Sequence, residues 1–246
     1  MRRGMRLVAT IGLAILFVLG AGLGLVVGLV VFAVALVRAA RAVHADGVVC
    51  RAELIARDPA AQRLAGPAVV RLSGAFEGQA TTGSDVLGVC IRMPDDGAAR
   101  RAQDLVLGSF ESFRTAARDR AGTDVGDYLA NHYSTVTPWW LTRHGPVILR
   151  LVPPPAAPRE RGSDRLARLD ADLAAGRARF SLTVDTPTGR AELAELRLVE
   201  RLPVDDRSLR ASMFRQGRGL RPLGARNGIR ATAYPMSQLA RRLRGG

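Results

Sequence analysis

Residues 222–241 read Pro222-Leu-Gly-Ala-Arg-Asn-Gly228-Ile-Arg230-Ala-Thr-Ala-Tyr234-Pro-Met-Ser-Gln-Leu-Ala-Arg241. The part of this stretch that ends at Gly228 is rich in Gly and Pro and predicts a turn, and a C-terminal helix is predicted from about Ile229. Arg230 lies four residues before Tyr234 and therefore shares its helix face. Arg241 lies two turns after the tyrosine along that face. The predicted helix thus presents one phenol flanked by two guanidinium groups.

Four short motifs that carry Arg, His, Ser or Asp residues precede this helix. They are Arg41-Ala-Val-His44, Val70-Arg71-Leu-Ser73, Asp85-Val-Leu-Gly88 and Asp104-Leu-Val106. Each has a structural explanation when taken alone, because a lone His near a strand is more often a surface or core residue. Tyr234 alone would likewise be read as a packed ring with a hydrated hydroxyl. Only their joint occurrence and order point to one site.

The sequence between these motifs predicts mainly β-strands. Strands are predicted over Gly47 to Ala56, Pro67 to Ser73, Val86 to Met93, Arg179 to Asp185 and Glu192 to Leu202, with another ending at Arg150-Leu-Val before three prolines. Helices are predicted over Asp104 to Asp119, where apolar residues recur at helical spacing, and over Asp164 to Ala175, closed by Gly176. The fold class is therefore α+β, with antiparallel β dominant.

An apolar segment opens the chain. Leu7 to Val37 contains no charged residue and only one polar residue, Thr10. This exceeds the roughly 20 apolar residues that cross a bilayer core, whereas a cleaved signal peptide has an apolar region of about 7–15 residues. We therefore predict a tail and a single transmembrane helix over residues 1–40 and one domain over residues 41–246. Arginines flank the span almost equally, so the side that holds the domain is not decided.

The formal net charge of +14 at first suggests a nucleic-acid or anionic-membrane partner. All 36 basic residues are Arg, which indicates a coding bias, and the chain lacks the interleaved aromatics of a base-stacking surface. We expect no nucleic-acid partner. Cys50 and Cys90 lie in apolar stretches and are read as small core residues, not as a disulfide. The three histidines are far apart, which disfavours a hydrolytic metal centre.

Taken together and in order, these motifs resemble the haem catalases, and more closely the small catalase-like proteins that lack the large enzymes' C-terminal extensions. Asn131-His-Tyr133-Ser134, followed by Pro138, is similar to the mid-domain segment of those small relatives. The resemblance runs with gaps from about Arg41 to Arg241. It implies an antiparallel β-barrel with surrounding helices, here preceded by the transmembrane helix.

The resemblance implies a haem b cofactor and a role for each motif residue. Tyr234 would ligate the iron as a phenolate, and the charge of Arg230 would keep that phenol ionised. His44 would be the distal acid and base, with Ser73 orienting its ring. The guanidinium groups of Arg41, Arg71 and Arg241 would bind the haem propionates.

One departure from the family pattern bears on activity. Catalases carry a distal Asn just after the segment aligned with Asp104-Leu-Val106, and this chain has Leu107, Gly108 and Ser109 there. We therefore expect a peroxidase or weak catalase acting on hydrogen peroxide or organic hydroperoxides. His44 follows the apolar span by only seven residues, which adds lipid hydroperoxides to the expected substrates. The alternative is a non-catalytic catalase-fold protein that binds haem or lipid as a sensor, store or scaffold.

Overall fold

The computed structural model describes residues 2–38, 44, 46–76, 83–97, 101–155, 164–186, 189–205 and 209–243. The α-helices are α1 (Arg2–Arg38), α2 (Ala116–Gly122), α3 (Arg165–Ala174) and α4 (Ala225–Leu243), and the short 3-10 helices are η1 (Pro59–Ala61) and η2 (Tyr128–Ala130). The longer strands are β1 (Gly47–Ala56), β2 (Gly66–Gly74), β3 (Leu87–Met93), β4 (Gln103–Gly108), β9 (Arg179–Thr186) and β10 (Gly189–Arg201). The shorter strands are β5 (Tyr133–Ser134), β6 (Trp139–Leu141), β7 (Gly145–Val147), β8 (Leu149–Val152) and β11 (Leu220–Pro222).

Eight of the strands close into a barrel. Their order around the barrel is β1-β10-β9-β8-β5-β4-β3-β2, and every neighbouring pair is antiparallel. A closed barrel leaves no unpaired edge strand, so its backbone hydrogen bonds are satisfied within the sheet. The predicted α+β class and antiparallel β-barrel are therefore confirmed.

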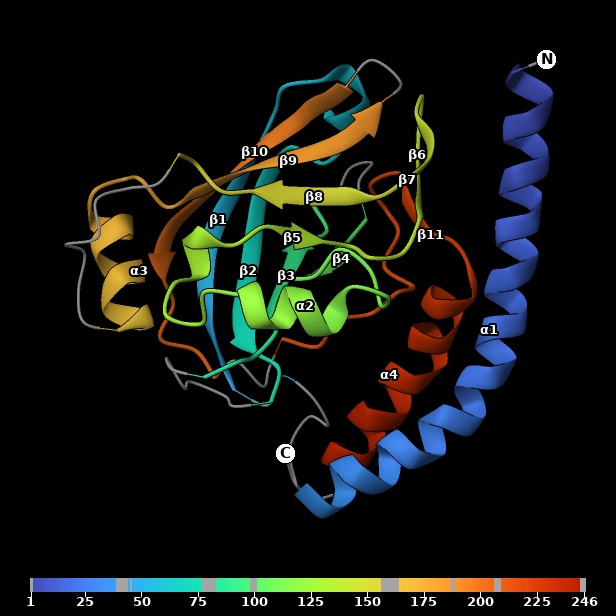
Figure 1. The fold of residues 1–246 in the computed structure, drawn as a ribbon, viewed down its shortest axis with the longest axis horizontal. Coiled ribbons are helices and arrows are strands. Elements are labelled where there is room, and N and C mark those ends of the chain that lie inside the picture. The colour runs from blue at the N-terminus through green and yellow to red at the C-terminus, as the bar shows by residue number, and fades with distance from the viewer. Residues whose placement is uncertain are drawn as a thin grey trace.

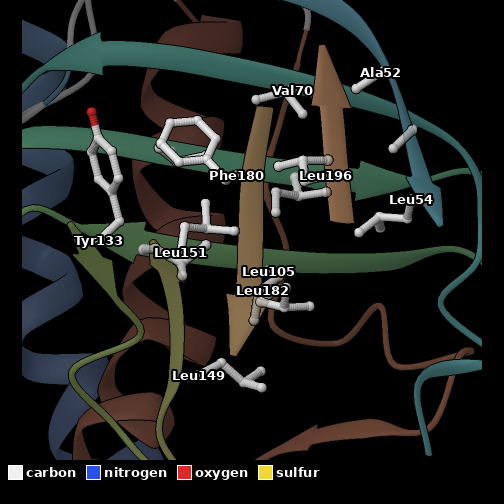
Figure 2. Packing of buried hydrophobic residues seen from close by; sticks show 14 of the residues in the cluster. Ala52, Leu54, Val70, Leu105, Tyr133, Leu149, Leu151, Phe180, Leu182 and Leu196 are labelled. Atoms are coloured by element: carbon white, nitrogen blue, oxygen red, sulfur yellow. The ribbon is translucent and has the colours of Figure 1, made fainter. Parts of the chain in front are cut away.

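Side chains from all parts of the barrel fill its interior. Figure 2 shows Leu54, Val70, Leu105, Phe180 and Leu196 converging inside the ring of strands. Each of these side chains is at most 2% exposed. Strand side chains alternate between the two faces, which is why every second residue of these strands enters the core.

The predicted helix over Asp104 to Asp119 is wrong. Its first residues form β4, which lies between β3 and β5, and only Ala116–Gly122 is helical. Because β4 is covered on both faces, Leu105, Val106 and Leu107 form a continuous apolar run. Periodicity alone does not distinguish such a run from a buried helix.

The predicted C-terminal helix begins earlier than expected, at Ala225. Asn227 is fully buried beneath its first turn, where its amide accepts from Thr137 Oγ1 at 2.9 Å and donates to the carbonyl of Pro138 at 3.1 Å. These bonds tie the start of α4 to the chain before β6. The helix therefore leaves the domain in a fixed direction.

α1 packs side by side with α4, as Figure 1 shows for the lower half of the blue helix and the red helix. The hydroxyl of Thr232 in α4 donates to the carbonyl of Ala21 in α1 at 3.0 Å. Val8–Val37 of α1 is long and apolar enough to cross a membrane. The predicted division at residue 40 stays a prediction, but the two parts are in direct contact.

Cys50 and Cys90 form no disulfide. Cys50 is completely buried, as predicted for a core residue, and burial raises the pKa of its thiol from 9.0 to about 12 against the smaller lowering effect of Arg201. Cys90 lies on β3 and is only partly buried. The two thiols therefore differ in accessibility.

Candidate functional site

A cavity of about 250 Å³ lies between the barrel and α4. The barrel wall is formed by His44 and by residues of β2, β3 and β4, and the opposing wall by Ala233, Tyr234, Ser237 and Gln238 of α4. Val31 of α1 and the segment 209–211 complete the lining. Most of this lining is apolar, so the cavity suits a mainly apolar ligand.

His44 is held from several sides just before β1. Its ring Nδ1 lies 3.1 Å from Ser73 Oγ, and its backbone N–H donates to the carbonyl of Ala75 at 2.8 Å. Its backbone φ is +58°, a left-handed conformation that costs free energy in a non-glycine residue. The pairing of Gly47 with Ser73 between β1 and β2 brings this loop beside the barrel wall.

The ring of His44 rests directly on Gly88 of β3. A Cβ added at Gly88 would lie 2.5 Å from the ring Cε1 and 2.8 Å from Nδ1. Only glycine leaves room for the imidazole at this position. The motif Asp85-Val-Leu-Gly88 thus has two structural tasks, because Asp85 also accepts from the backbone N–H groups of Phe76 and Val86.

Arg71 places a buried cation on the cavity wall. Its side chain is 5% exposed, and its Nη2 donates to the carbonyl of His44 at 2.9 Å. Gly47 makes room for it, because a Cβ there would lie 2.9 Å from the guanidinium carbon. Arg71 therefore both fixes the His44 loop and brings positive charge to the cavity.

Tyr234 lines the cavity from α4, half-buried and packed against the barrel core. Arg230, one turn earlier, does not line the cavity; its Nη1 lies 3.4 Å from Thr137 Oγ1. The role predicted for Arg230 toward the phenol stays a prediction. Arg41 lies outside the described residues, and so does the side chain of Arg241.

The structure thus brings four of the seven predicted site residues to one cavity: His44, Arg71, Ser73 and Tyr234. Leu107 stands where the family pattern has an amide, but it pairs with Val89 of β3 and its side chain lies in the barrel core, whereas Val106 shares the cavity face with Cys90.

Sequence reasoning missed Arg210, which also lines the cavity. Its backbone carbonyl accepts from Arg215 Nη1 at 2.6 Å and from Arg92. Both of these arginines also bind the buried carboxylate of Asp104, Arg92 through two nitrogens at 2.9 and 3.1 Å and Arg215 at 2.8 Å. Only the motif Asp104-Leu-Val106 signalled this network, since arginines are common throughout the chain.

Asp104 explains how a segment without regular structure is held in place. Its side chain is fully buried and also accepts from the backbone N–H of Ser212 at 2.8 Å. Burial alone would lower the pKa of Arg92, but the hydrogen bond and charge of Asp104 raise it above its ordinary value. The Arg92 guanidinium therefore stays charged, and its hydrogen bonds to Asp104 and to the carbonyl of Arg210 anchor residues 210–215.

The residues present fit a haem. The donor set combines an imidazole on the barrel wall with a phenol on the helix wall, and Tyr is one of the proximal haem ligands. The lining is mainly apolar, as a porphyrin requires, and Arg71 supplies a cation for a carboxylate. Among the described residues, no group of three or more His, Cys, Asp or Glu could hold a bare metal ion.

Comparison with solved structures supports the fold. A bacterial catalase matches with a TM-score of 0.52 and 13% identity over 82% of this chain and 57% of its own. A fungal catalase matches with a TM-score of 0.53 and 13% identity over 82% of this chain and 58% of its own. No protein-family model and no curated protein matches the chain. The chain therefore has a catalase-like fold and spans less than two thirds of the length of these two catalases.

Proposed function

We propose that this chain is a membrane-attached, haem-dependent peroxidase or weak catalase acting on hydrogen peroxide or organic hydroperoxides. The observation that carries the proposal is that His44 and Tyr234 line one cavity from opposing walls, the barrel and α4. The catalase-like fold agrees with this assignment but does not by itself define chemistry.

Each residue of the cavity has a task in this proposal. Tyr234 would hold the haem iron through its phenol oxygen, and Arg71 and Arg210 would pair with the haem carboxylates. The bound haem supplies the redox chemistry that peroxide cleavage needs. His44 would accept a proton at Nε2 from one peroxide oxygen and return it to the other, with Nδ1–H donating to Ser73 Oγ so that Nε2 acts as the acceptor.

The first experiment is a haem titration of the full chain in detergent. Haemin is added to wild type, Tyr234→Phe and Tyr128→Phe, and the absorption spectra are compared. Tyr128 lies in η2 and does not line the cavity, so its variant is the matched control. We expect wild type and the control to share one bound spectrum that Tyr234→Phe loses. A Tyr234→Phe spectrum identical to wild type would overturn the ligand assignment.

The cavity also supports a second candidate function, a non-catalytic protein that stores or senses haem or lipid. The observation in its favour is the mainly apolar lining of the cavity, to which β4 contributes Val106, a side chain that cannot hydrogen-bond peroxide. Peroxide consumption by the haem-loaded chain separates the two functions. Turnover no faster than that of free haemin, and unchanged in His44→Ala, would favour storage or sensing.

Membrane attachment through α1 is part of the proposal. It is supported by the length and apolar character of Val8–Val37 and by the exposure of most of its large side chains. The sequence predicts a single crossing, which protease accessibility from each side of sealed vesicles would test. Val31 places this apolar helix at the cavity, so hydroperoxides of lipids belong to the proposed substrates. Activity on hydrogen peroxide with none on a fatty-acid hydroperoxide would exclude them.

A further inference from the structure

Three glycines of α1 lie on the face that meets α4. Gly20, Gly24 and Gly28 recur at every fourth position and are all buried. An added Cβ would lie 1.9 Å from the Ala225 carbonyl oxygen at Gly20 and 2.7 Å from Ile229 Cα at Gly24. The two helix backbones therefore approach as closely as in the small-residue packing of membrane helices.

The contact is reciprocal and includes a hydrogen bond. A Cβ at Gly228 of α4 would lie 2.0 Å from the Phe17 carbonyl oxygen in α1. Thr232 Oγ1 donates to the carbonyl of Ala21 at 3.0 Å. Because backbone contacts the backbone on both helices, neither helix can rotate or slide without a clash. Tyr234 lies two residues after Thr232, on the helix that this contact holds.

The same helix reaches the cavity directly. Val31, one turn beyond Gly28, lines the cavity together with Ala233 and Tyr234. The domain alone therefore provides two walls, and α1 provides a third.

We propose that α1 is a structural part of the haem site as well as the membrane attachment, and that its glycine face positions Tyr234 and closes the cavity. This rests on the proposed function only in naming haem as the ligand. Packing on α4 uses one face of α1, while exposed side chains such as Val18 and Val26 leave another for lipid. Attachment to lipid along the exposed face and site formation on the packed face can therefore occur together.

Cys90 is a natural reporter for this third wall. It is partly buried and lines the cavity, so its thiol becomes more accessible when α1 leaves α4. The only other cysteine, Cys50, is fully buried, which makes it a silent internal reference. The labelling rate therefore reads the state of the cavity without haem and without activity.

The test compares substitutions at two glycines of the same helix. Gly24→Leu and Gly24→Ala disturb the packed face, whereas Gly22→Leu and Gly22→Ala are matched controls, because an added Cβ at Gly22 has no atom within 4 Å. Each pair changes apolar surface and helix propensity equally. The full chain is labelled in detergent with a small maleimide, and the modified cysteine is identified by peptide mass. Circular dichroism follows the folded state.

We expect Cys90 to react about tenfold faster, or more, in Gly24→Leu than in wild type, with a smaller increase in Gly24→Ala. Both Gly22 variants should match wild type. If Gly24→Leu does not fold, the inference is decided by whether Cys90 reacts faster in Gly24→Ala than in Gly22→Ala. Equal rates in all the folded variants would overturn the inference.

Haem titration of the same proteins separates this inference from the proposed function. If wild type binds haem but Cys90 reacts equally fast in the Gly24 and Gly22 variants, the proposed function stands and the role of α1 is refuted. If wild type binds no haem but Cys90 still reacts faster in Gly24→Leu, α1 remains the third wall of the cavity and the proposed function is refuted. If both hold, Gly24→Leu should also bind haem more weakly than Gly22→Leu.

Discussion

His44 illustrates how single residues are placed against their own preferences. A left-handed backbone at a non-glycine residue costs about 1–3 kcal/mol, and His44 has a φ of +58°. Its contacts with Ser73, Ala75 and Arg71 offset that cost. Strain held by surrounding bonds is typical of functional positions. It agrees with the proton-carrying role that we propose for this ring.

We predict that Gly88→Ala will displace the imidazole. The new methyl group would lie 2.5 Å from Cε1, so the ring must leave its hydrogen bond with Ser73. Peroxide turnover should fall about tenfold or more, because a misplaced acid-base group loses most of its effect. Haem binding through Tyr234 should persist. Gly122→Ala, which meets no atom within 4 Å, is the control, and equal turnover in the two variants would contradict the prediction.

Cys50 makes stability depend on pH in the alkaline range. Its folded pKa of about 12 is raised from 9.0, so the folded thiol stays neutral where the unfolded thiol ionises. The contribution of Cys50 to the free energy of unfolding is therefore complete below pH 9 and is lost as the pH rises from 9 toward 12. Relative to Cys50→Ala, wild type should lose roughly 1.4 kcal/mol of unfolding free energy between pH 8 and pH 10. Urea unfolding at both pH values measures this, and a constant difference would refute it.

At the scale of elements, predictability depended on how each strand is covered. The bounds of β1, Gly47–Ala56, were predicted correctly, since turn residues delimit a Val-rich segment. β4 was taken for a helix because both of its faces are covered, which removes the alternation that identifies a strand.

Long-range pairing explains what remained hidden in the site. Arg210 is held at the cavity by Arg92 and Arg215, which bind its backbone carbonyl and also bind Asp104, more than one hundred residues earlier, and nothing local marks it. The spacing of Gly20, Gly24 and Gly28 was readable as a helix-packing motif, but its partner on α4 was not. His44, Ser73 and Tyr234 were found because their motif types and order resemble a known family.

The Asp104 network yields a prediction about the segment it anchors. Asp104→Asn removes the buried charge that pairs Arg92 and Arg215, and leaves two cations close together. Breaking a buried pair in this way should lower the free energy of unfolding by about 3 kcal/mol. Glu200→Gln is the matched control, because its pair with Arg51 is more than half exposed on both sides and contributes at most about 1 kcal/mol. Thermal unfolding of both variants tests the difference, and similar losses would count against the network.

The whole molecule consists of a barrel that is complete in itself and two helices that complete a cavity beside it. The barrel holds His44, Ser73 and Arg71 on one wall, while Tyr234 depends on the placement of α4 against the barrel and α1. A ligand that bridges these parts stabilises their assembled arrangement over the separated one. Ligand binding should therefore be visible in the stability of the whole chain.

We predict that haemin will raise the unfolding temperature of the full chain. A ligand present at one hundred times its dissociation constant stabilises the native state by about 2.7 kcal/mol, which for a chain of this size corresponds to roughly 5–10 °C. In Tyr234→Phe, haemin should raise the unfolding temperature less, because only the apolar contacts of the porphyrin ring remain. Iron-free protoporphyrin should give that same smaller shift in wild type and in Tyr234→Phe. If haemin and protoporphyrin stabilise wild type equally, the iron has no ligand in the cavity, and binding rests on apolar contact alone.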